Sequence, residues 1–239
     1  MQRAFGRLES PDSRDALFPV SAILAGVPPE LTEKYWWADG WWGDQGMTTQ
    51  CTCYSWMHLI EDGPVVQDAI PGRVKPMIDP AKLYHEAQIR DPWAGENYPG
   101  TSVRSVAKIL HDLDIIKEYR WATSVQDVIN TVLTIGPMVV GTKWFSGMSA
   151  PDARGVISIS GHDMGGHAYV INGVNLDKNM FRIKNSWGKK WGKDGYAFVD
   201  IDAWGKLLSN GGDAAIPFEN KVTSALDWTK LREPGVYKD

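Results

Sequence analysis

A predicted β-hairpin in the second half of the chain constrains its fold more than any other feature. Two apolar runs, residues 168–174 and 180–183, flank a turn at 175–179 that is rich in Asn and Asp. β-branched and aromatic residues in the runs, with turn formers between them, predict two antiparallel strands. His167 begins one strand and Asn185 ends the other, so the hairpin brings these side chains together. An imidazole held by an amide oxygen is suited to be the general base of a nucleophilic site.

Cys51 is the candidate nucleophile for this base. It lies between a polar, glycine-containing loop at 43–50 and an apolar segment at 52–62, which stops at a Gly-Pro pair. The pattern predicts a helix that starts at the cysteine. The positive end of the helix dipole and a neighbouring imidazolium both favour the thiolate. Gln45 could donate its side-chain amide to a developing oxyanion, alongside the backbone N–H of Cys51.

Longer motifs surround these residues. Residues 185–196 match every fixed position of the pattern Asn-Ser-Trp-Gly-x-x-Trp-Gly-x-x-Gly-Tyr. His167-Ala168 precedes a hydrophobic strand. A Gln-Gly pair at 45–46 stands six positions before Cys51. In these motifs and in their order the chain resembles the papain-like cysteine peptidases. The resemblance implies an α+β, two-lobed fold with a helical lobe, an antiparallel β-barrel-like lobe and the active site in the cleft between them.

The sequence around the cysteine differs from that of the better-known members, which read Cys-Gly-Ser-Cys-Trp. Residues 49–54 of this chain read Thr-Gln-Cys-Thr-Cys-Tyr. The spacing from Gln45 assigns Cys51, and not Cys53, as the nucleophile. Two residues along a helix is about 200°, so Cys53 is predicted to point away from Cys51 into the core. The pattern is closer to the simpler microbial and viral relatives that lack disulfides.

The resemblance implies hydrolysis of peptide bonds in peptide or protein substrates. The implied catalytic residues are Cys51, His167, Asn185 and Gln45. The implied substrate-binding residues are Gly100, Met138, Gly141, Ala168 and Trp187. In the family, the counterpart of Trp187 also shields the His–Asn contact from water. Three of the substrate-binding positions line the main specificity pocket of relatives, and they suggest an apolar side chain there: Met138, Gly141 and Ala168.

Charge and composition exclude other classes. Lys+Arg number 25 and Asp+Glu 29, giving a net charge of −4 without a basic run, which disfavours nucleic-acid binding. We expect no membrane association and cytoplasmic synthesis, because no apolar run could span a bilayer and no signal-peptide core is present. The two cysteines are not expected to form a disulfide, which agrees with a reducing compartment. His162-Asp163 lacks enough further ligands for zinc, so we expect no metal and no other cofactor.

Helices first and strands second predict one papain-like domain over residues 1–218. An extended arm at 1–44 would join a helical lobe at about 45–135 and a sheet lobe at about 136–218. The helices are expected at 52–62, 80–90, 103–113 and 124–135. Besides the hairpin, strands are expected at 138–142, 156–158 and 196–201. The arm is too short for the family's inhibitory prosegment, so we expect activity on synthesis without processing. Residues 219–239 have no counterpart in relatives and are expected to wrap the body or to bind a protein partner.

Two other functions stay open. The same triad could perform another cysteine-dependent acyl transfer, as a transglutaminase or a cell-wall amidase does; the motif at 185–188 favours the peptidase. The papain-like fold could also serve as an interaction or structural module of a larger assembly. Thr49-Gln50 before the cysteine, the short arm and the C-terminal extension favour that alternative.

Overall fold

The computed structural model describes residues 3–24, 30–36, 40–64, 72–95 and 97–218. The predicted C-terminal extension at 219–239 lies outside the described residues. Within these ranges the α-helices are α1 (Cys51–Asp62), α2 (Pro80–Arg90), α3 (Val103–Asp112), α4 (Val125–Thr134) and α5 (Ile201–Ser209). Three short 3₁₀ helices accompany them: η1 (Ser13–Leu17), η2 (Val20–Ala22) and η3 (Ser146–Met148).

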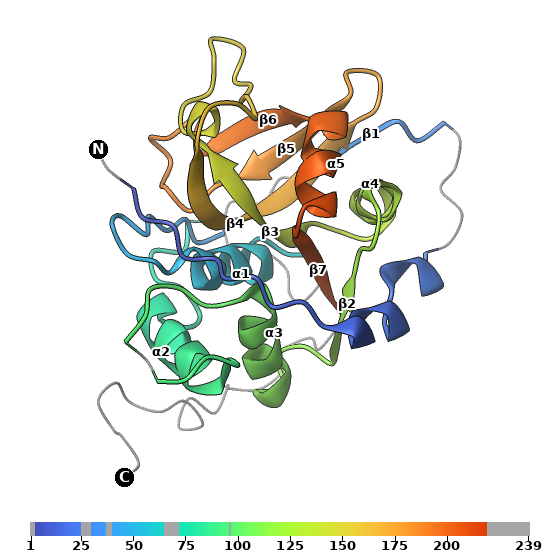
Figure 1. The fold of residues 1–239 in the computed structure, drawn as a ribbon. Helices are drawn as coiled ribbons and strands as arrows, with labels where there is room; N and C mark the ends of the chain where they lie inside the picture. Colours follow the sequence, from blue (N-terminus) through green and yellow to red (C-terminus); the bar gives the residue numbers. More distant parts are fainter. Residues whose placement is uncertain (1–2, 25–29, 37–39, 65–71, 96, 219–239) are drawn as a thin grey trace.

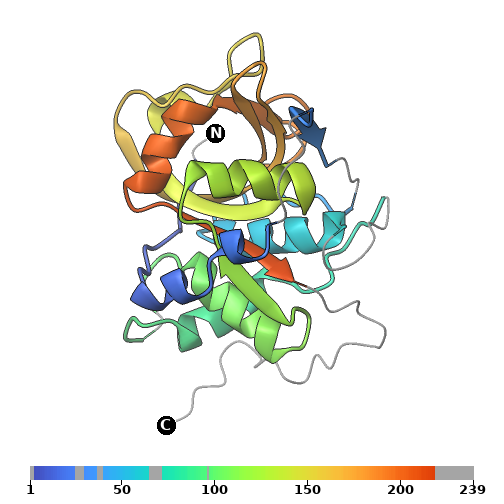
Figure 2. The same cartoon turned by 90° about the vertical axis from the view of Figure 1, so that its right-hand side faces the viewer.

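A single antiparallel sheet organises the fold. Its strands are β1 (Glu33–Tyr35), β2 (Glu118–Trp121), β3 (Met138–Phe145), β4 (Asp163–Asn175), β5 (Met180–Lys184), β6 (Tyr196–Asp200) and β7 (Asp213–Phe218). They lie in the order β2-β7-β3-β4-β5-β6, with β1 paired to β4. In Figure 1 the strands β4, β5 and β6 form the upper part, and α1, α2 and α3 form the lower part. The view turned by 90° shows α4 and α5 beside the upper part of the sheet (Figure 2).

Local capping signals explain why the predicted helices form where they do. Helix α1 begins at Cys51 and stops before Gly63. Asp79 accepts a hydrogen bond from the first turn of α2, and Ser102 does the same for α3. Helix α4 starts with a capping box in which Ser124 and Asp127 exchange hydrogen bonds. The four helices predicted from the sequence are therefore confirmed to within two residues at each end.

The predicted hairpin is confirmed as β4 and β5, which pair antiparallel around the turn. β4 is longer than expected because it begins at Asp163, so His167 lies inside the strand and does not open it. The extra length comes from pairing with β3, where Thr142 faces His167 and Gly141 faces Ala168. The backbone of His167 is thus paired with β3, and its side chain is bonded to Asn185, which follows β5.

Several elements differ from the sequence expectation. The arm is not simply extended, because it contains η1, η2 and β1, and β1 joins the sheet. β2, β7 and α5 were not predicted at all. Residues 156–158 were expected to form a strand, but Val156 forms only an isolated bridge to Phe198. Ile201, expected to end a strand, begins α5 instead, with Asp200 as its N-cap.

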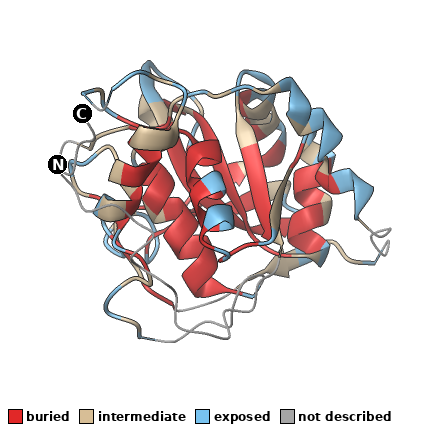
Figure 3. Cartoon of the chain, turned by 90° about the horizontal axis from the view of Figure 1, so that it is seen from below, coloured by how far each residue is buried: buried red, intermediate tan, exposed pale blue. Residues whose placement is uncertain are grey.

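The two parts of the fold are joined by buried contacts. One hydrophobic cluster combines α1, α2 and α3 with Val139, Ala168 and Ala215 of the sheet, and Figure 3 shows the buried helices next to buried strands. Lys184 on β5 also forms a buried ion pair with Asp62 at the end of α1, at 2.5 Å. No helix in the described residues is long and apolar enough to cross a membrane.

Candidate active site

Cys51 is the first residue of α1, and its side chain is completely buried. The backbone N–H groups of Ala168 on β4, of Gly6 in the N-terminal arm and of Thr52 lie near its sulfur. Burial raises the pKa of the Cys51 thiol to about 11, although these N–H groups favour the thiolate. The helix start therefore places the sulfur against the residue that follows His167. Cys53 is also a buried free thiol, within the core cluster around α1, as its position on the helix predicted.

His167 and Asn185 meet as the hairpin predicted. His167 Nε2 lies 2.9 Å from Asn185 Oδ1, and both side chains are fully buried. The Trp187 ring covers this pair, with its centroid 5.0 Å from that of the imidazole. Burial lowers the pKa of His167 to about 4, and the Asn185 hydrogen bond opposes that shift. The other ring nitrogen, Nδ1, has no hydrogen-bond partner in the described part of the chain, which leaves it free to take a proton.

Gln45 is hydrogen-bonded to Ser186, just after the end of β5. Its Oε1 accepts a hydrogen bond from Ser186 Oγ at 2.5 Å, and its backbone N–H donates to Ser186 O at 2.8 Å. Its side-chain Nε2 donates to Ala4 O at 3.1 Å and to Thr48 O at 2.6 Å. Because Ser186 directly follows Asn185, the side-chain amide is held beside the hairpin. It already binds a peptide carbonyl, that of the chain's own Ala4.

The N-terminal segment at residues 4–8, which we call the arm segment, covers this site. Arg7 N–H donates to Gly166 O, Leu8 N–H donates to Thr101 O, and Thr101 N–H donates to Gly6 O, each at 2.9 Å. Figure 1 shows the start of the chain running past α1 towards η1. The arm segment is thus held between β4 and the residues just before α3, and it lies next to Cys51; activity on synthesis without processing stays a prediction.

Gly100 and Thr101 provide one wall for the arm segment. Gly100 has a φ of 106°, and a Cβ on it would be 2.5 Å from Gly6 O, so only glycine permits this approach. Gly100, which the resemblance implied to be a substrate-binding residue, thus lies against backbone of the chain itself. Thr101, which makes the hydrogen bonds, was missed by sequence analysis, as was Gly166 on the opposite wall. Both act through backbone atoms, which leave no signal in side-chain type.

The predicted specificity-pocket residues separate into two groups. Gly141 and Ala168 face each other across β3 and β4. Met138 lies three positions before Gly141 and therefore points to the opposite face of the strand, where it is buried in the core cluster of the sheet lobe. The structure thus does not bring Met138 to the pocket.

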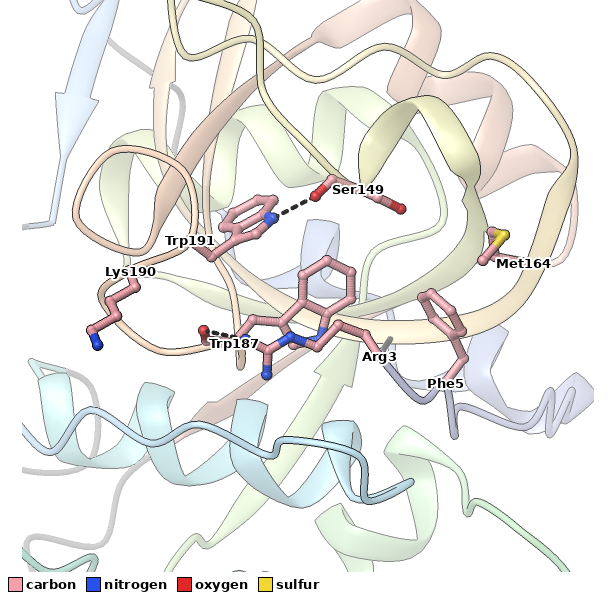
Figure 4. Close-up of a pocket in the computed structure, with 7 residues that line it drawn as sticks. All are labelled: Arg3, Phe5, Ser149, Met164, Trp187, Lys190 and Trp191. Atoms are coloured by element: carbon pink, nitrogen blue, oxygen red, sulfur yellow. Dashed lines mark hydrogen bonds between the residues drawn. The ribbon is translucent and has the colours of Figure 1, made fainter. Parts of the chain in front are cut away.

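A hollow with a volume of about 560 Å³ adjoins Trp187 (Figure 4). Arg3 donates a hydrogen bond to Trp187 O, and Trp191 Nε1 donates to Ser149 O at 2.8 Å. The ring of Phe5, in the arm segment, lies 5.7 Å from that of His167. The described residues contain no group of three or more His, Cys, Asp or Glu side chains that could hold a metal ion.

Comparison with known families identifies the motifs of the sheet lobe. A model of the papain family of cysteine proteases matches residues 83–205, more than half of the chain and the part that contains His167, Asn185 and Trp187. The uncharacterized peptidase C1-like protein L477 of Acanthamoeba polyphaga mimivirus is 28% identical over 136 residues, which cover 55% of this chain and 38% of that protein. Aminopeptidase C of Listeria innocua is 48% identical over 46 residues, 18% of this chain and 10% of that enzyme. This chain thus spans less than two fifths of the length of these curated relatives.

Solved structures share the fold over most of the chain. Xylellain, a cysteine protease from Xylella fastidiosa, matches with a TM-score of 0.69 and 17% identity over 92% of this chain and 99% of its own. Bromelain from Ananas comosus matches with a TM-score of 0.57 and 15% identity over 81% of this chain and 100% of its own. These likenesses confirm the predicted α+β, two-lobed, papain-like fold. With the family model matched over more than half of its length, the chain belongs to the papain family of cysteine proteases.

Proposed function

We propose that this chain hydrolyses peptide bonds in peptide or protein substrates through Cys51, His167, Asn185 and Gln45. The observation that carries the proposal is the buried hydrogen bond between His167 and Asn185 at 2.9 Å, beside a cysteine at the start of a helix. The bond holds the imidazole in one orientation and leaves Nδ1 as its proton-accepting nitrogen. Contact between the Cys51 sulfur and the Ala168 N–H supports the same arrangement.

The proposed reaction proceeds in two stages. His167 takes the Cys51 proton, and the thiolate attacks the substrate carbonyl carbon to form a tetrahedral oxyanion. The Gln45 side-chain amide and the Cys51 backbone N–H donate to that oxyanion. Its collapse breaks the C–N bond, and His167 returns the proton to the leaving amine. Water, activated by the same imidazole, then hydrolyses the thioester and restores the thiol.

Substrate reaches this site only after the arm segment has moved. Ala4 O holds the Gln45 amide, and the Gly6 backbone lies against the Cys51 sulfur. A thiol that is kept neutral by burial is a poor nucleophile. Displacement of the arm segment would admit water, lower the pKa of the thiol and raise that of the imidazole, so that the thiolate–imidazolium pair can form.

An epoxide-type thiol inhibitor tests the proposal. We expect modification of one cysteine per chain, mapped to Cys51 by peptide mass spectrometry, together with hydrolysis of fluorescent casein. The same assays are also run on the variant Gly6→Ala, described below. This variant covers the case in which the arm segment of the unmodified chain uncovers Cys51 too slowly for labelling. If neither chain is modified or cleaves casein, the alternative of an interaction or structural module is favoured. Labelling without casein hydrolysis, but with peptidoglycan cleavage or amine transfer, would favour the other acyl transfers.

Gly6→Ala is expected to open the site. A Cβ at position 6 would lie 1.9 Å from Thr49 O, which is backbone and cannot move aside easily. The arm segment must therefore leave, and the thiol pKa should fall from about 11. Each unit of that fall should raise the alkylation rate at pH 8 by roughly threefold to tenfold, because the thiolate fraction grows faster than its intrinsic reactivity declines. The rate is measured with iodoacetamide as a function of pH.

Arg14→Ala is the control for this measurement. Arg14 also lies in the N-terminal region, but its side chain is exposed and pairs with the neighbouring Asp12. Its alkylation profile should match that of the unmodified chain. An unchanged rate and pH midpoint in Gly6→Ala would contradict the role of the arm segment in covering Cys51.

A further inference from the structure

The side chain of Arg7 fills a pocket next to the site. Arg7 is 4% exposed. Its Nη2 donates to Asp213 Oδ2 at 2.9 Å and to Gly211 O at 2.6 Å, and Glu9 lies near its Nη1 at 3.5 Å. A hollow of about 410 Å³ continues from Arg7 and Asp213 towards the surface, with Glu9 among its lining residues. The pocket therefore accepts a long cationic side chain and binds it through a carboxylate and a carbonyl.

The sheet fixes this pocket relative to the candidate nucleophile. Asp213, the first residue of β7, pairs with Gly141 on β3, and Gly141 pairs with Ala168 on β4. Ala168 follows His167, and its N–H lies near the Cys51 sulfur. Adjacent strands are about 4.8 Å apart, so the backbone of Asp213 lies about 10 Å from that of Ala168. That distance corresponds to roughly three residues of an extended peptide.

Gly141 makes the space in which Arg7 lies. A Cβ at position 141 would be 2.4 Å from Asp213 Oδ1 and 2.8 Å from Arg7 Nε. Any larger residue would fill the pocket between the sheet and the carboxylate. The sequence expectation of an apolar pocket rested on Met138, Gly141 and Ala168. It did not include Asp213, which stands 45 positions later in the chain than Ala168.

The buried polar atoms of the pocket are suited to a cation. Asp213 Oδ1 has no hydrogen-bond partner among the described residues, and neither has Arg7 Nε. Burial raises the pKa of Asp213, and the Arg7 charge opposes that shift. The Asp213 side chain is 19% exposed, but its Oδ1 is buried. A buried carboxylate oxygen without a partner is unfavourable, so an apolar occupant suits this pocket less well than a cation does.

We propose that this pocket, formed by Gly141, Gly211 and Asp213, is the specificity pocket of the peptidase and takes an arginine or lysine side chain of the substrate. Arg7 occupies it in the covered state as an internal surrogate for that side chain. The proposal rests on the proposed function, since it names the substrate class of the same site. It replaces the apolar preference expected from the sequence.

Peptide binding to a chain that cannot turn over tests the pocket separately from catalysis. The full chain carries Cys51→Ala, Gly6→Ala to displace the arm segment and Arg7→Ala to vacate the pocket. The probes are fluorescein-labelled alanine hexapeptides with arginine, citrulline or leucine at each position in turn, measured by fluorescence polarisation. Citrulline has nearly the shape of arginine but no charge. At one position arginine should bind roughly tenfold to a hundredfold more tightly than citrulline, as for a buried charge-assisted hydrogen bond.

Asp213→Asn in the same background should abolish the arginine preference. Asp152→Asn is the matched control, because Asp152 pairs with Arg154 outside this pocket and its loss should leave the preference unchanged. Equal affinity for arginine and citrulline at every position, absence of binding by every arginine peptide, or a preference that survives Asp213→Asn would overturn the proposal. Hydrolysis by the chain with Cys51 intact is measured in parallel. Arginine preference without hydrolysis would refute the proposed function alone, and hydrolysis without the preference would refute the pocket alone.

Discussion

Cys51→Ala is expected to abolish peptide hydrolysis, with a fall of at least roughly a thousandfold in kcat/KM. The substitution removes the atom that forms the thioester, and the remaining groups can only bind and polarise the substrate. Folding should be little affected, because the lost sulfur is a small group at the first position of α1. The measurement is hydrolysis of a fluorogenic peptide at matched protein concentration, with a thermal unfolding scan to establish that the variant is folded.

Cys53→Ala is the matched control for this prediction. Cys53 is two residues further along the same helix, is equally buried and belongs to the core cluster around α1. Its loss should lower stability modestly and leave kcat within a few fold of the unmodified chain. Loss of activity in Cys53→Ala with activity retained in Cys51→Ala would reverse the assignment of the nucleophile.

Gln45→Ala is expected to lower kcat by about 10² to 10³ while leaving the fold intact. Removal of one oxyanion donor has an effect of this size, because the interaction strengthens as charge develops on the substrate oxygen. The variant also loses the hydrogen bond to Ala4 O, so the arm segment should release more readily. Thiol labelling should therefore be unchanged or faster although turnover is slow. Steady-state kinetics and inhibitor labelling on the same preparation separate the two effects.

Ser186→Ala serves as the companion variant. Ser186 Oγ donates to Gln45 Oε1 and orients the amide without reaching the substrate. Its loss should reduce kcat less than Gln45→Ala does, because the backbone bond between the two residues remains. A change in KM alone for Gln45→Ala, with kcat unchanged, would argue against an oxyanion role.

Sequence reasoning succeeded where the signal was local. Helix α2 begins at a proline behind a capping aspartate, and α4 begins with Ser124 and Asp127 in a capping box. The hairpin followed from two β-prone runs around an Asn/Asp turn. In each case residues within a few positions determine both the element and its end. Tertiary contacts then only position the element.

The elements that were missed depend on distant partners. β7 contains Ala214, Ala215 and Pro217, which have low strand propensity, and it forms by pairing with β2 and β3. Helix α5 starts at the residue after β6, so no turn residues separate the strand from the helix. β1 joins the sheet through β4, whose paired residues stand some 140 positions later. Neither the strand and helix propensity of these segments nor their hydrophobic periodicity predicts these long-range contacts.

The candidate site shows the same division. Cys51, His167, Asn185 and Gln45 could be named because their side chains belong to motifs with fixed spacing. Asp213 could not be named, because its partner Arg7 is 206 positions away and neither residue belongs to a motif. That pairing becomes visible only when the arm segment and β7 are placed together.

The buried ion pair of Lys184 and Asp62 has a consequence for the way the molecule comes apart. One charge belongs to a strand of the upper lobe and the other to a helix of the lower lobe. If the lobes separated, each charge would lose its partner while it was still surrounded by apolar side chains. An uncompensated buried charge of this kind costs about 3–5 kcal/mol. Denaturation of either half therefore removes the electrostatic support of the other, and the two lobes lose their structure as one cooperative unit.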